Sequence, residues 1–115
     1  MPISRPVDDA APIDLAHLQR MTLGDIALER EVLGLFARQA SQLAAALATM
    51  PPETSAVVHT LKGSARAIGA VRVAEAAAAL EAAIRDGQAP AQALGVLRDT
   101  VVEADAAIAA LLRRS

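Results

Sequence analysis

The chain has 115 residues, a formal net charge of −2 and no cysteine. A single domain of this size leaves no room for an additional kinase domain, and without cysteine there can be no disulfide and no thiolate metal site. The negative charge, with one phenylalanine and neither tyrosine nor tryptophan, offers nucleic acid no basic surface and no stacking platform for bases.

A membrane segment is also not expected. The longest stretch without a charged residue, between Arg38 and Glu53, includes several polar residues, so it falls short of the roughly 20 apolar residues that a membrane span needs. The N-terminus lacks the apolar core of a signal peptide. We therefore expect a cytoplasmic protein, and the use of ten arginines against one lysine favours a bacterial source.

The N-terminal residues predict a lead-in and a short helix. Residues 1–12 hold three of the six prolines and show no hydrophobic period, which predicts a flexible lead-in before a domain over residues 13–115. Asp14 is a suitable cap for a short helix through about residue 20. Residues 22–25 have the spacing of a capping box, and Gly24 predicts a break before the next helix.

The next predicted helix spans residues 25–50, where Pro51 and Pro52 end it. Its apolar residues recur at steps of three and four, which is typical of a buried helix face. The predicted core positions are Ile26, Leu33, Phe36, Ala40, Leu43, Leu47 and Met50.

Three further amphipathic helices are predicted over residues 53–68, 71–86 and 91–113, the first two ended by Gly69 and Gly87. Their expected core positions are Val58, Leu61, Ala65 and Ile68, then Val73, Ala77, Leu80 and Ile84, then Leu94, Leu97, Val101, Ala104, Ile108 and Leu111. Short turns between long helices predict an all-α fold, an antiparallel up-down-up-down four-helix bundle with a short extra N-terminal helix. Because these apolar faces are used inside the bundle, we expect a monomer.

One face of the helix over residues 53–68 carries an unusual set of residues. His59, Lys62, Gly63 and Arg66 share a sector opposite the predicted core stripe, so the histidine is expected to point to water. An exposed imidazole is a good nucleophile near neutral pH. Lys62 is the only lysine of the chain, and Gly63 leaves open the space beside the ring, as exchange of a phosphoryl group with a large partner would require.

The stretch from His59 to Ala70 resembles the signature of the histidine-containing phosphotransfer (HPt) domain, which runs His-x-x-Lys-Gly and closes with a hydrophobic residue and a glycine. The matching positions are His59, Leu61, Lys62, Gly63, Ile68 and Gly69. Ala67 departs from the pattern, since many relatives carry a small polar residue there. Beyond this stretch the resemblance is one of helix pattern.

The resemblance implies a phosphocarrier, not an enzyme with its own ATP site. His59 would accept a phosphoryl group at Nε2 from the aspartate of a receiver domain, or from a kinase, and pass it to a response-regulator aspartate. Lys62 would offset the phosphoryl charge with help from Arg66, and Gly63 would let the receiver dock. Receiver domains of response regulators and hybrid histidine kinases are the implied partners. No cofactor or metal is expected in this chain, because the receiver supplies the Mg²⁺.

Glu81 is a further candidate on the next helix. HPt domains commonly carry a glutamine or glutamate there that hydrogen-bonds one ring nitrogen of the histidine, and Glu81 resembles this position. A carboxylate accepting from Nδ1–H would fix the tautomer and leave the Nε2 lone pair free. His17, the other histidine, has no such neighbours and is interpreted as an ordinary surface residue.

Two alternatives stay open on the sequence. The chain could be an HPt-like docking module that regulates a kinase or receiver without carrying phosphate, in which case binding would survive the loss of His59. It could also be a substrate domain of a chemotaxis-type kinase, phosphorylated directly by an ATP-binding domain. The glutamate at position 81, where a glutamine could stand, keeps this alternative open.

Overall fold

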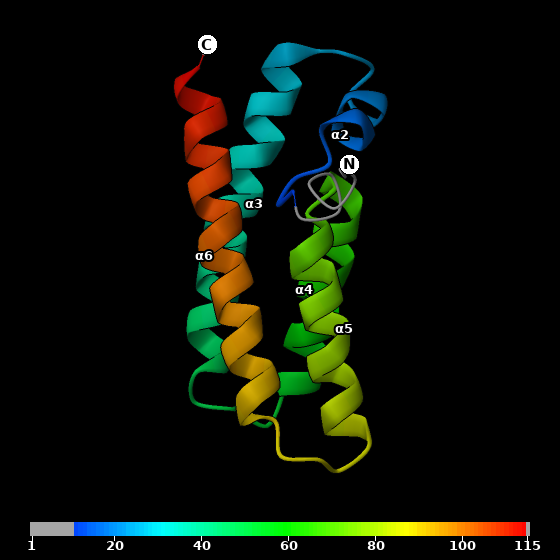
Figure 1. Cartoon of the computed structure of the whole chain (residues 1–115), viewed down its shortest axis with the longest axis vertical. Helices are drawn as coiled ribbons and strands as arrows, with labels where there is room; N and C mark the ends of the chain where they lie inside the picture. The colour runs from blue at the N-terminus through cyan, green and yellow to red at the C-terminus, as the bar shows by residue number, and fades with distance from the viewer. Residues whose placement is uncertain (1–10, 115) are drawn as a thin grey trace, which may run out of the picture.

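The computed structural model describes residues 11–114, and the regular secondary structure of this part of the chain is all helical, without strands. Its five helices are α2 (Leu15–Met21), α3 (Ile26–Leu47), α4 (Thr54–Ile68), α5 (Val71–Arg85) and α6 (Ala91–Arg113). The long helices α3 to α6 alternate in direction, and α2 lies near the end of the bundle where α4 finishes (Figure 1). The predicted all-α, up-down-up-down four-helix bundle with a short N-terminal helix is confirmed. Of the predicted flexible lead-in, residues 1–10 lie outside the described residues.

The core lies between the four long helices, each of which packs against two neighbours in the ring α3, α4, α5, α6. The predicted stripe of α4 is confirmed, because Val58, Leu61, Ala65 and Ile68 are all buried. Leu47 of α3, Leu80 of α5 and Leu97 and Ile108 of α6 are also fully buried. This packing fixes the rotation of α4 about its axis, so the opposite face of α4 is turned to solvent.

The predicted limits and core of α3 need two corrections. The helix ends at Leu47 and not near Met50. Pro51 disfavours the right-handed helical conformation in the residue before it, and Met50 lies outside that conformation, with a positive φ of 48°. Met50 is 36% exposed, and Ile26 is 67% exposed because it begins α3 where neighbouring helices do not cover it. Both residues are wrongly predicted as core.

The predicted capping box over residues 22–25 is also wrong, because its two ends serve different helices. The Thr22 hydroxyl donates to the carbonyl of Leu18 at 3.0 Å and closes α2. The Asp25 carboxylate accepts from the backbone N–H of Leu28 at 3.1 Å and begins α3. Between them, Gly24 adopts a φ of 76° and reverses the chain, so the predicted break is confirmed.

Helix α2 is held against the C-terminal end of α4. The backbone N–H of Asp14 donates to the carbonyl of Gly69 at 2.8 Å. His17 Nε2 lies 3.0 Å from the carbonyl oxygen of Ala67, so this nitrogen donates to one of the last carbonyls of α4. The interpretation of His17 as an ordinary surface residue is therefore corrected: it joins α2 to the helix that carries His59.

Gly69→Ala is expected to lower the free energy of unfolding by roughly 2 kcal/mol for the strained backbone position, and by more in total because the added Cβ would also clash with the residue before α2. Gly69 has a φ of 84°, and an added Cβ would lie 2.9 Å from the Asp14 carbonyl oxygen. Gly87→Ala is the matched control, because Gly87 has a φ of 70° but no atom within 4 Å of an added Cβ. Denaturant unfolding of both variants measures the difference, and an equal loss would contradict the proposed close packing of α2.

Candidate functional site

His59 lies on the solvent-facing side of α4, near the middle of the helix. Its neighbours Val58 and Leu61 are fully buried, which anchors the helix on both sides of the histidine. The His59 side chain itself is 71% exposed. An imidazole in this position is open to a large partner, while the backbone below it is held by the core.

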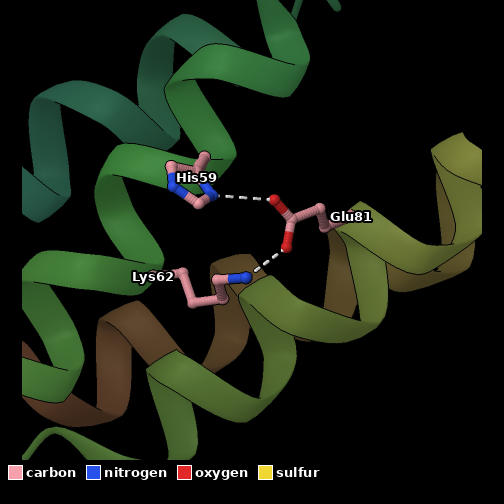
Figure 2. Close-up of polar contacts among 3 residues, drawn as sticks. All are labelled: His59, Lys62 and Glu81. Carbon is pink, nitrogen blue, oxygen red and sulfur yellow. Dashed lines mark hydrogen bonds and ion pairs between the residues drawn. The ribbon is translucent and has the colours of Figure 1, made fainter.

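Glu81 reaches His59 from the neighbouring helix α5. Its position is fixed by the fully buried Leu80 directly before it, and its Oε2 lies 3.0 Å from His59 Nδ1 (Figure 2). A carboxylate oxygen accepts hydrogen bonds, so this geometry favours the tautomer with the proton on Nδ1. The lone pair on Nε2, at the other edge of the ring, is then free to attack an electrophile.

Lys62 contacts the same carboxylate from α4. Its Nζ donates to Glu81 Oε1 at 2.5 Å, and its side chain is only 15% exposed. The hydrogen bond from Lys62, followed by the one from His59, lowers the pKa of Glu81 below its ordinary value. Glu81 is therefore a carboxylate at neutral pH and can hold the Nδ1 proton of His59.

The other predicted site residues lie along the same helix without joining this group of three. Gly63 is exposed, and nothing lies within 4 Å of the position that a Cβ would take. Arg66 is exposed, and among residues 11–114 its side chain has no hydrogen bond or ion pair. Gly69 ends α4 in the left-handed conformation. The structure thus brings His59, Lys62 and Glu81 together, while the roles of all six residues stay predictions.

The ion pair between Lys62 and Glu81 is the feature that the sequence did not predict. The two residues are 19 positions apart and on different helices, and the sequence related each of them to His59 or to the phosphoryl group. The available signal was the apolar periodicity, which places Lys62 on the same side of α4 as His59 and places Glu81 beside the buried stripe of α5. It gives the facing sides of the helices but not the rotamers of long side chains.

The surroundings of His59 are an open surface. A cavity of about 280 Å³ lies farther along α4, between α2, α4 and α5. Arg66 and His17 are among its lining residues, and His59 is not.

Within residues 11–114, no group of three His, Asp or Glu residues is placed to hold a metal ion. None of the described helices is long and apolar enough to cross a membrane.

The role that the resemblance implies for Glu81 predicts that Glu81→Ala slows phosphoryl uptake at His59 by roughly 10- to 100-fold, the size of loss seen when the hydrogen-bond partner of a metal-bound histidine is removed. Glu81→Gln should lose less, because its amide oxygen can still accept from Nδ1–H. Rates of phosphoryl uptake from a common donor measure both effects. Equal rates for Glu81→Ala and the unchanged protein would contradict a role for the carboxylate.

A helical bundle with an exposed histidine, whose Nδ1 lies beside a carboxylate and whose Nε2 is free, fits the phosphotransfer module that the sequence signature resembles. Residues 30–113 match the family model described as the Hpt domain. The chain belongs to this family. No curated protein has a matching sequence.

Two solved structures are similar to this chain. The histidine phosphotransferase ShpA from Caulobacter crescentus is 33% identical, with a TM-score of 0.72, over 89% of this chain and 91% of that chain. A rice structure described as a histidine-containing phosphotransfer protein is 22% identical, with a TM-score of 0.79, over 94% of this chain and 84% of that chain. The likeness to the rice structure supports the fold, and the likeness to ShpA supports both the fold and the family.

Proposed function

We propose that this chain is a phosphocarrier of a phosphorelay, with His59 as the residue that carries the phosphoryl group. The observation that carries the proposal is the pairing of an exposed His59 with Glu81 at 3.0 Å, which leaves Nε2 free. Membership of the Hpt family and the likeness to ShpA support the same function.

The transfer step follows from this geometry. The Nε2 lone pair of His59 forms a bond to phosphorus as the bond from phosphorus to the aspartyl oxygen of the donor breaks, and that aspartate leaves as a carboxylate with the electron pair. The imidazole ring becomes cationic, and Glu81 stabilises it through the Nδ1–H. Onward transfer reverses these events on a second aspartate. Phosphoryl transfer depends mainly on positioning and charge stabilisation, so a bundle that holds the ring is sufficient on this side of the reaction.

Receiver domains are the proposed partners on both sides of the relay. In the part of the chain that the structure describes, no side chain beyond the two chain neighbours of Gly63 lies within 4 Å of its Cβ position, which leaves room for a domain to approach His59. Arg66 is exposed on the same face and would contribute to docking. The Mg²⁺ that aids transfer would be bound by the receiver, and the ATP used by the pathway would be bound by an upstream kinase.

A bacterial two-component pathway in the cytoplasm is the proposed setting, with this chain acting as a monomer. Its likeness to the Caulobacter crescentus protein and its preference for arginine support a bacterial source. The burial of the apolar stripes inside the bundle supports a monomer.

The test is incubation with a phosphorylated receiver domain and Mg²⁺, followed by intact-mass measurement. We expect the gain of one acid-labile phosphoryl group. A parallel arm uses an ATP-binding kinase domain with ATP and no receiver. Phosphorylation in that arm alone would identify a direct kinase substrate, and binding to receivers without any phosphorylation would identify a regulatory docking module.

A further inference from the structure

The cavity of about 280 Å³ between α2, α4 and α5 has an apolar floor and a polar rim. The floor includes Ala65 of α4, which is fully buried, and Ala74 of α5, which is 6% exposed. Small-molecule sites join an apolar lining to a few polar groups and have volumes of roughly 300 to 1,000 Å³. This cavity is therefore suited to a small ligand. The polar side chains of its rim are Asp14, His17, Arg66 and Glu75.

Two of these four polar side chains are engaged within the protein. Asp14 Oδ1 accepts a hydrogen bond from the backbone N–H of His17 at 3.1 Å. His17 Nε2 lies 3.0 Å from the carbonyl oxygen of Ala67. These contacts hold α2 in place as one wall of the cavity, and they leave the recognition of a charged ligand mainly to the other two side chains.

Arg66 and Glu75 are available to a ligand. Arg66 belongs to α4 and Glu75 to α5, and both are exposed. Among residues 11–114, neither side chain has a hydrogen bond or an ion pair. Arg72, one turn before Glu75, donates instead to Glu103 of α6 at 2.8 Å. The cavity thus presents a cation from one helix and a carboxylate from the next, beside an apolar floor.

We propose that this cavity is a binding site for small apolar amino acids. The guanidinium of Arg66 binds the α-carboxylate of the ligand, the carboxylate of Glu75 binds its α-ammonium group, and its aliphatic side chain lies against Ala65 and Ala74. A simple anion would face the carboxylates of Asp14 and Glu75, and a simple cation would face Arg66. A ligand that carries both charges avoids both repulsions, and its binding does not depend on the proposed function of His59.

The test is a titration of the full chain, without receiver or phosphate, with L-leucine up to the millimolar range. In ¹H–¹⁵N NMR spectra we expect saturable shifts of the backbone amides of Gly69 and Ala74, which line the cavity, and none at Gly95 of α6, which does not. Isocaproate has only the carboxylate of leucine, and isoamylamine has only its ammonium group. Each should bind about tenfold more weakly, as expected for the loss of one hydrogen bond to a charged group.

Variants of the lining test the assignment of the two charges. Arg66→Met and Glu75→Gln should each weaken L-leucine binding about tenfold. Arg85→Met is the control, because it removes an exposed charge from α5 outside the cavity and should leave binding unchanged. Ala78→Leu should abolish binding, because Ala78 is a half-buried lining residue and a leucine there would fill the space.

The proposal is overturned if L-leucine causes no saturable shift, or if isocaproate or isoamylamine binds as tightly as L-leucine. It is also overturned if binding is unchanged in Arg66→Met and Glu75→Gln, or persists in a folded Ala78→Leu variant. A failure of every receiver to phosphorylate His59 would instead count against the proposed function and would not alter the binding result.

Discussion

His59→Gln is expected to abolish phosphorylation by any receiver or kinase, because it removes the only nucleophile that the site presents. Glutamine has no nitrogen lone pair available for attack on phosphorus, whereas the imidazole has one at Nε2. The fold should be preserved, since the His59 side chain is 71% exposed and exposed substitutions usually change stability by no more than about 0.5 kcal/mol. Phosphoryl uptake and thermal unfolding, measured together, separate loss of function from loss of structure.

His17→Gln is the matched control for that experiment. His17 lies at the junction of α2 and α4, where its Nε2 is 3.0 Å from the carbonyl of Ala67. This variant is expected to lose about 1 kcal/mol of stability, the typical value of one hydrogen bond, and to remain phosphorylated. Phosphorylation that survives His59→Gln and disappears with His17→Gln would show that the wrong histidine has been assigned.

Gly63→Leu is expected to reduce the transfer rate by roughly 100-fold, the size of loss that follows when reacting groups are displaced by about 1 Å. Gly63 lies one turn from His59, and among the described residues no side chain beyond its two chain neighbours lies within 4 Å of its Cβ position, so the leucine would project into the space that a receiver needs. The same change should raise the free energy of unfolding by up to about 1 kcal/mol, because leucine favours helix more than glycine does. Stability and transfer should therefore change in opposite directions.

Gly95→Leu gives the control for helix propensity. Gly95 is an exposed glycine inside α6, again with nothing within 4 Å of its Cβ position, and α6 carries none of the site residues. Gly95→Leu should raise the free energy of unfolding as much as Gly63→Leu does, and it should leave the transfer rate unchanged. Unchanged transfer in Gly63→Leu would contradict docking over this glycine.

The bundle was predictable from the sequence because its apolar residues follow the helical period so regularly. Val58, Leu61, Ala65 and Ile68 are buried as predicted, and their spacing alone turned His59 to solvent. Prediction failed at helix ends, where neighbouring structure decides. The periodicity included Met50 and Ile26, but a proline and an uncovered end of the bundle exclude both from the core.

The site was predictable in part. The spacing from His59 to Gly63 lies within one helix turn, so local geometry placed these residues on one face. The contact of Lys62 with Glu81 joins two helices, and it depends on the separation of their axes and on two flexible side chains. The hydrogen bond of His17 was not predictable for the same reason. It joins His17 to Ala67, 50 residues away, and depends on how α2 crosses the end of α4.

The central claim is that His59 carries the phosphoryl group on Nε2 while Glu81 holds Nδ1. The most direct test is NMR of the ¹⁵N-labelled, phosphorylated protein, in which coupling to ³¹P identifies the bonded nitrogen. We predict a coupling at Nε2 of His59 and a proton retained on Nδ1. A phosphoryl group on Nδ1 of His59, or on His17, would contradict the claim.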